Sequence, residues 1–125
     1  MEPKILIVDD EIIIRMLIEQ SLEELEDEGV QLLLAADGEE ALEIIQAESP
    51  QLVFLDVMMP KRDGFDVCRT VKQDLGMTNV HIVLLTARGQ EYDRQKGAEV
   101  GADTYITKPF DPDELLEISE RVLDL

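Results

Sequence analysis

The chain has 125 residues, 45% of them hydrophobic and 32% charged, which is the composition of one globular domain with a single sizeable core. Its formal net charge of −18 would repel phosphate backbones and anionic lipids, so the sequence argues against direct nucleic-acid or membrane partners. No apolar run reaches membrane-spanning length, and the first residues lack the layout of a signal peptide. The single cysteine, Cys68, cannot form an internal disulfide, and we expect it to be a core residue of a cytoplasmic protein.

Five short apolar runs recur along the chain, at residues 5–8, 32–35, 52–55, 82–85 and, more weakly, 105–106. Continuous apolarity, in place of an apolar–polar alternation, is typical of strands that are covered on both faces and therefore of a parallel sheet. The spacing between the runs leaves room for a helical crossover each time. The pattern predicts an α/β fold.

Helical signals fill the segments between these runs. The first segment has an apolar stripe at helical spacing, formed by Ile14, Leu17, Ile18, Ser21, Leu22 and Leu25. Asp37 and Asp111 stand where N-cap residues precede helices, and Asp63-Gly64 leads into another. The segment 90–100 has the weakest stripe, and we expect its helix to be the least firmly held. The order of elements predicts one domain over residues 1–125, a (βα)5 flavodoxin-like fold with a doubly wound parallel sheet of five strands.

The third apolar run ends in a carboxylate, Asp56, and Pro60 follows within a few residues. A charged side chain is rarely buried without partners, so Asp56 is a poor candidate for core filling. It fits the mouth of a strand, where an open α/β sheet keeps its ligand site. Taken alone, an Asp that starts a turn is an equally good interpretation.

Polar residues follow four of the five runs. Asp9 and Asp10 close the first run, Asp56 the third, Thr86 the fourth, and Lys108 follows the fifth. Each has an ordinary structural interpretation, as an N-cap, a strand residue or a solvated lysine. The carboxyl ends of parallel strands meet at one edge of the sheet, however, and that edge is where such folds bind ligands.

Three carboxylates and one ammonium in one pocket would leave a charge of −2. Each close carboxylate pair would repel by roughly 3–4 kcal/mol at an effective dielectric constant near 20. A divalent cation with a preference for hard oxygen ligands removes this repulsion. Mg²⁺ suits the site because it accepts one or two carboxylates and keeps water and substrate oxygens as further ligands.

The motifs together resemble a response-regulator receiver domain of two-component signalling. They are Asp9-Asp10, Asp56 with Met59-Pro60 and Asp63-Gly64, Thr86-Ala87, Gly101-Ala102-Asp103, Tyr105, and Lys108-Pro109-Phe110. The resemblance covers essentially the whole chain, and the order and spacing of the motifs make it specific. The chemotaxis member of this family has strand order 2-1-3-4-5, which the resemblance implies here.

The resemblance also implies a phosphoacceptor. Asp56 would be the nucleophile that takes a phosphoryl group from a phosphohistidine on a sensor histidine kinase or histidine phosphotransfer domain. Asp10, Asp56 and the backbone carbonyl of Met58 would bind Mg²⁺ (or Mn²⁺) directly, and Asp9 would act through water. The domain would catalyse only its own phosphorylation and dephosphorylation, so it would not be an enzyme acting on other substrates.

The remaining family positions imply a switch. Lys108 would hold phosphoryl oxygens, and Thr86 would donate a hydrogen bond to one of them. Tyr105 would change rotamer as Thr86 moves, and a surface for a downstream protein target would change with it. By strand alternation Tyr105 faces away from Lys108, and a half-exposed aromatic on an edge strand is its ordinary interpretation. The resemblance implies a cis bond between Lys108 and Pro109, although X-Pro statistics alone favour trans.

Several points stay open on the sequence alone. Met58 and Arg88 occupy places that tune phosphate lifetime in the family, and no lifetime can be read from them. The apolar Ile12 and Ile13 stand beside the acidic residues, where members of the family dock the phosphodonor, and burial of one of them is the ordinary interpretation. A phosphorylation-dependent dimer is also left open. The chain ends just after its last predicted helix, so we expect a free-standing receiver without an output domain, and a fragment of a longer regulator is the other interpretation.

Three other classes compete with this interpretation. A hydrolase similar to the haloacid dehalogenases would want a second acid two residues after its nucleophile, where this chain has Met58. A flavodoxin-like redox carrier would want a phosphate-binding loop where Asp9-Asp10-Glu11 would repel phosphate. The runner-up is a receiver-like interaction module that works without phosphorylation, but such a module would usually have lost Asp56, the acid pair or Lys108.

Overall fold

The computed structural model describes residues 2–87 and 91–125, with the side chains of residues 87 and 91–94 left out of the description. Its centre is a five-stranded, all-parallel sheet in the order β2-β1-β3-β4-β5. The strands are β1 (Lys4–Val8), β2 (Gln31–Ala35), β3 (Leu52–Asp56), β4 (His81–Ala87) and β5 (Thr104–Lys108). The fold class and the strand order predicted from the sequence are confirmed.

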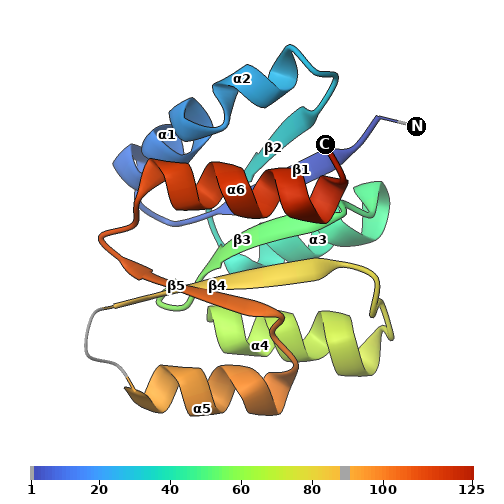
Figure 1. The fold of residues 1–125 in the computed structure, drawn as a ribbon. Coiled ribbons are helices and arrows are strands. Elements are labelled where there is room, and N and C mark those ends of the chain that lie inside the picture. The colour runs from blue at the N-terminus through green and yellow to red at the C-terminus, as the bar shows by residue number, and fades with distance from the viewer. Residues whose placement is uncertain (1, 88–90) are drawn as a thin grey trace.

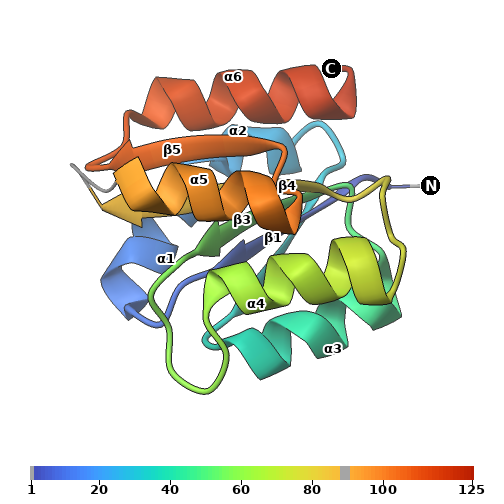
Figure 2. The same ribbon diagram turned by 90° about the horizontal axis from the view of Figure 1, so that it is seen from below.

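Helices cover both faces of the sheet (Figures 1 and 2). On one face lie α1 (Ile12–Ser21), α2 (Glu23–Glu26) and α6 (Pro112–Leu123), and on the other lie α3 (Gly38–Glu48), α4 (Gly64–Arg69) and α5 (Glu91–Val100). A π-helical turn, η1 (Thr70–Asp74), continues α4. Among the described residues, no helix combines the length and the apolarity needed to cross a membrane.

The two helical layers explain why the strands read as continuous apolar runs. Successive strand residues point to opposite faces, so Leu6 and Val8 pack with α3 and α4, whereas Ile5 and Ile7 pack with α1 and α6. Cys68 lies in the first of these cores, as predicted, and burial raises the pKa of its thiol to about 12. The core is therefore two apolar layers with the sheet between them.

The first predicted helix is shorter than expected. It ends at Ser21, whose hydroxyl donates to the Leu17 carbonyl at 2.7 Å, and Leu22 leaves the helical region with φ −106° and ψ 4° before α2 begins. Leu17, predicted to be in the buried stripe, is 46% exposed. Ile18 and Leu22 are fully buried, so the contact stripe follows the i, i+4 spacing and Leu17 falls at its margin.

The Asp63-Gly64 pair shapes the start of α4. The Asp63 side chain caps the helix by accepting a hydrogen bond from the Asp66 backbone N–H at 2.8 Å. Gly64 lies against the end of β3, and its N–H donates to the Val57 carbonyl at 2.9 Å. A Cβ atom at Gly64 would collide with the Asp56 carbonyl oxygen and stand 2.9 Å from the Val57 Cα. The close approach requires glycine here, because backbone cannot rotate aside as a side chain can.

Gly64→Ala should destabilise the fold by about 2–4 kcal/mol, because the added Cβ must displace the backbone of β3. Urea denaturation followed by circular dichroism measures the change in the free energy of unfolding. Glu43→Ala, on the exposed side of α3, is the control and should change it by less than about 0.5 kcal/mol. Equal stabilities for Gly64→Ala and the wild type would refute the close contact.

Candidate functional site

Three carboxylates gather at the carboxyl edge of the sheet. Asp9 follows β1, Asp10 comes next, and Asp56 is the last residue of β3. Each offers one oxygen, and these oxygens all lie within 4.8 Å of one another. Asp9 is fully buried and Asp56 is 4% exposed, whereas Asp10 is exposed. The structure therefore brings together the three acidic residues singled out in the sequence and opens them to solvent on the Asp10 side.

Lys108, the last residue of β5, reaches across to two of these carboxylates. Its Nζ lies 3.1 Å from Asp9 Oδ2 and 3.0 Å from Asp56 Oδ1. The three residues lie at the ends of three different strands and are separated by up to 99 positions in the sequence. One ammonium thus serves two buried carboxylates, and a negative charge remains uncompensated in the pocket.

Asp9 is held from several sides. Its Oδ1 accepts the Glu11 backbone N–H at 2.9 Å while its Oδ2 faces Lys108. Its backbone carbonyl accepts a hydrogen bond from Arg15 Nη1 at 2.6 Å. This role of Arg15 was not predicted, because a bond to a backbone carbonyl leaves no recognisable residue pair in the sequence. With both carboxylate oxygens engaged, Asp9 is less available than Asp10 as a direct ligand of a cation.

The electrostatics follow from burial and charge. Burial and then the negative charge of Asp9 raise the pKa of Asp56 to about 6, against the opposing effect of Lys108. For Lys108, burial lowers the pKa, but the hydrogen bonds and charges of Asp56 and Asp9 outweigh it, so the net direction is upward. The Lys108 ammonium therefore stays charged, whereas the pocket destabilises the charged form of Asp56.

The donor set fits a hard divalent cation. Three carboxylates with one ammonium leave an excess of negative charge, and carboxylate oxygens at one mouth of the sheet are ligands that Mg²⁺ accepts. Asp10 is solvent-accessible, as a ligand must be for a cation that keeps several waters. The part played by the Met58 backbone carbonyl stays a prediction, and the Met58 side chain is 75% exposed.

The two predicted switch residues lie on the other face of the sheet. Thr86 is 3% exposed on β4, and the strand register places Leu84 opposite Tyr105 on β5. By alternation, Thr86 and Tyr105 share the face of α3, α4 and α5, whereas Asp56 and Lys108 share the other. No hydrogen bond among the described residues joins Thr86 to Asp56 or Lys108. Tyr105 packs against Gly97 of α5, where a Cβ atom would collide with the tyrosine ring.

Three further predictions concern the Lys108–Pro109 bond, the Ile12-Ile13 pair and Arg88. The Lys108–Pro109 peptide bond is cis, the isomer that the family resemblance implies. Ile12 and Ile13 are 62% and 67% exposed beside the acidic pocket, so neither is the buried residue of the ordinary interpretation. Arg88 lies outside the described residues.

Comparison with known proteins assigns the family. Residues 5–120 match the family model of the response regulator receiver domain. The chain belongs to this family. It is 51% identical over 112 residues to "Probable transcriptional regulator ycf27" of Cyanophora paradoxa, covering 90% of this chain and 44% of that protein. It is 46% identical over 115 residues to the alkaline phosphatase synthesis transcriptional regulatory protein PhoP of Bacillus subtilis, covering 92% of this chain and 46% of that protein.

A solved structure gives the same result. The Vibrio cholerae chemotaxis protein CheY4 superimposes with a TM-score of 0.84 at 34% identity, covering 98% of this chain and 99% of that one. The chain spans less than half the length of the two curated relatives. It is a receiver domain of two-component signalling, a class of domain that accepts phosphoryl groups at an acidic, Mg²⁺-binding pocket.

Asp56→Asn should stabilise the metal-free protein near neutral pH and lose this advantage in acid. The pKa of Asp56 rises from its usual 3.8 to about 6 on folding, so between these values the folded state keeps a proton that the unfolded state has lost. The stability of the wild type therefore falls as the pH rises through this window, by up to about 3 kcal/mol from this group, and the Asn variant is spared this loss.

Urea denaturation in EDTA from about pH 4 to about pH 7.5 measures the difference in the free energy of unfolding between variant and wild type. Asp27→Asn, at the exposed end of α2, removes the same charge away from the pocket. For this control, the difference in the free energy of unfolding from the wild type should not change with pH. A difference for Asp56→Asn that also does not change with pH would contradict a raised pKa at Asp56.

Proposed function

We propose that Asp56 is the phosphoacceptor of this receiver domain. The observation that carries the proposal is a nearly buried carboxylate at the end of β3 that shares the Lys108 ammonium with Asp9 and lies within 4.8 Å of two other acids. A structural acid would gain nothing from two acidic neighbours, because each raises the cost of its charge. A site for a transferred phosphoryl group explains why the charges are kept together.

In the proposed reaction an Asp56 carboxylate oxygen attacks the phosphorus of a phosphohistidine. An O–P bond forms, the P–N bond breaks, and the electron pair returns to the imidazole of the donor. Bound at Asp10, Asp56 and the Met58 carbonyl, with Asp9 acting through water, Mg²⁺ or Mn²⁺ would supply positive charge to the phosphoryl oxygens. Lys108, already 3.0 Å from Asp56 Oδ1, would supply a second positive charge.

The proposed switch begins at Thr86. Thr86 follows Leu85, which pairs with Asp56 in the register of β3 and β4. A short movement of the end of β4 can therefore bring the Thr86 hydroxyl to a phosphoryl oxygen on Asp56. Tyr105 shares the sheet face of Thr86 and packs on α5, which makes it the residue through which this movement reaches the surface. The phosphoryl group supplies the differential interaction that shifts the population.

We also propose partners and a cellular location for the domain. The donor is a sensor histidine kinase or a histidine phosphotransfer domain, and the domain catalyses its own phosphorylation and dephosphorylation. The product is a changed surface for a downstream protein in the cytoplasm, with phosphorylation-dependent dimerisation as one form that the change can take. The two curated relatives are named for transcriptional regulation, but the charge of −18 disfavours direct contact between this domain and nucleic acid.

Incubation with acetyl phosphate should add one phosphoryl group to the protein only when Mg²⁺ is present. Asp56→Asn should abolish the gain, because the amide cannot form an acyl phosphate. Intact-mass spectrometry measures the product, and hydroxylamine should remove it from the wild type, as it cleaves acyl phosphates.

Asp27→Asn removes an exposed carboxylate just after α2 and should be phosphorylated like the wild type. A mass gain that persists in Asp56→Asn would move the acceptor to another residue. No gain under any condition would favour the receiver-like interaction module that works without phosphorylation.

Lys108→Ala should slow phosphorylation of Asp56 by about 100-fold, the usual cost of losing one charged group that stabilises a transferring phosphoryl. The rate of mass gain with acetyl phosphate and Mg²⁺ measures the effect, with circular dichroism as a check of folding. Lys4→Ala removes a lysine paired with Glu48 at the opposite end of the sheet and should leave the rate unchanged. Equal rates for Lys108→Ala and Lys4→Ala would show that Lys108 has no part in the transfer.

A further inference from the structure

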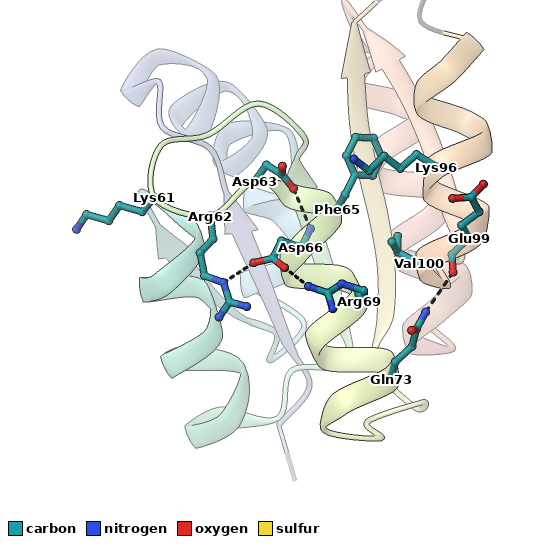
Figure 3. Close-up of a pocket in the computed structure, with 10 residues that line it drawn as sticks. All are labelled: Lys61, Arg62, Asp63, Phe65, Asp66, Arg69, Gln73, Lys96, Glu99 and Val100. Atoms are coloured by element: carbon teal, nitrogen blue, oxygen red, sulfur yellow. Dashed lines mark hydrogen bonds and ion pairs between the residues drawn. The ribbon is translucent and has the colours of Figure 1, made fainter.

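A groove of about 580 Å³ lies between α4 and α5, away from the acidic pocket (Figure 3). Arg62, Asp66 and Arg69 form one wall, Lys96 belongs to the other, and Phe65 and Val100 supply apolar surface. Gln73 Nε2 donates to the Glu99 carbonyl at 3.1 Å and ties the two helices together at one end. None of the residues that line the groove belongs to the phosphoacceptor site.

The charge of this groove is opposite to that of the chain as a whole. Four of the chain's 11 Lys and Arg residues line the groove, together with three acidic residues, so the lining carries a formal charge of +1 on a chain of −18. One of the four, Lys61, points away from the other lining side chains in Figure 3 and pairs with Asp37 outside the groove at 3.5 Å. The cations are Lys61, Arg62, Arg69 and Lys96. Such a concentration is not needed for solubility, which the acidic surface already provides.

Two of the three acidic residues in the groove already form hydrogen bonds within the protein. Asp63 caps α4 through the Asp66 backbone N–H. Asp66 lies between two guanidinium groups, with Oδ2 at 2.5 Å from Arg62 Nε and Oδ1 paired with Arg69 Nη2. A second bond from Arg62 Nη2 to Thr70 Oγ1, at 2.9 Å, fixes the first guanidinium. The carboxylate thus holds the two arginines in place, and most of their N–H donors stay available.

The opposite wall adds a cation over an aromatic ring. Lys96 Nζ lies 5.2 Å from the centre of the Phe65 ring. Among residues 2–87 and 95–125, no carboxylate forms an ion pair with Lys96. The groove therefore presents two braced guanidinium groups on one side and an ammonium on the other, with apolar surface from Phe65 and Val100.

We infer that the groove between α4 and α5 binds an acidic segment of a partner protein. Guanidinium groups match carboxylates in geometry, and the apolar surface suits a neighbouring apolar side chain of the same segment. Small-molecule sites are lined mostly by apolar residues, whereas this lining is mostly charged. A long polyanion such as nucleic acid would meet the field of the whole acidic chain, but a short segment meets mainly the local cations.

The groove is independent of phosphoryl transfer but close to it in the chain. Its α4 wall follows Asp56 through the loop that carries Lys61 and Arg62, and its α5 wall follows Thr86 along the chain. A partner held there would contact residues 61–63 of the loop after Asp56 and the lining residues of α5, which are Lys96, Glu99 and Val100. The inference concerns the unmodified protein and stands or falls without the proposed chemistry of Asp56.

The test uses a fluorescein-labelled peptide of sequence Asp-Glu-Phe-Asp-Glu-Asp and the unmodified full chain. Fluorescence anisotropy measures affinity at about 150 mM salt, where a Debye length near 8 Å screens the overall charge more than the groove contacts. Arg69→Ala and Lys96→Ala should each weaken binding about fivefold, and the double variant more than about tenfold. Arg121→Ala, which changes the net charge equally at the exposed end of α6, should stay within about twofold.

Amide chemical shifts of ¹⁵N-labelled protein locate the peptide. Shifts confined to the residues of the groove, lost in the double variant and absent with the Asn-Gln-Phe-Asn-Gln-Asn peptide, would support the inference. No binding at millimolar peptide, shifts elsewhere, or equal loss in Arg121→Ala would overturn it. Inorganic phosphate that binds as tightly as the acidic peptide would also overturn it, because the site would then be one for a small anion.

Discussion

One ammonium shared by two buried carboxylates is the interaction on which the site depends. Lys108 joins Asp9 and Asp56, and through them it connects the ends of β5, β1 and β3. The arrangement is poor for stability, since burial and the Asp9 charge push the pKa of Asp56 up to about 6. A fold that only needed a stable core would place apolar residues at these positions. The retained negative charge fits a bound divalent cation, which would offset the repulsion between the carboxylates.

The sheet topology makes this arrangement possible. In the order β2-β1-β3-β4-β5 the first strand lies beside the third, so Asp9 and Asp56 become neighbours although 47 positions separate them in the chain. Gly64 then lets α4 start directly against the backbone of Asp56, and its N–H fixes the Val57 carbonyl. Asp56, the proposed acceptor, is therefore held by its strand on one side and by the start of α4 on the other. Precise placement of this kind is what phosphoryl transfer requires of a protein.

Much of this organisation could be predicted from the sequence because it is carried by local patterns. Apolar runs ending in Asp9, Asp56, Thr86 and Lys108 predict both the parallel sheet and its polar edge, and the family motifs give the strand order. The break before α2 and the exposure of Leu17 were not predicted, since helical periodicity alone does not say where a stripe leaves the sheet. The bond from Arg15 to the Asp9 carbonyl was missed for a similar reason, because it ends on backbone and has no sequence signature.

The groove between α4 and α5 was beyond sequence reasoning for a further reason. Its cations come from residues 61–69 and from position 96, and only the packing of the two helices on one face of the sheet brings them together. Along the sequence each is an ordinary surface residue of a strongly acidic chain. Asp66 turns two of them into a fixed pair, and Lys96 over Phe65 completes the opposite wall. The two charged regions of the domain thus have opposite signs: an acidic pocket that calls for a cation, and a cationic groove that fits an acidic chain. The two walls of the groove follow β3 and β4 in the chain, the strands that carry Asp56 and Thr86.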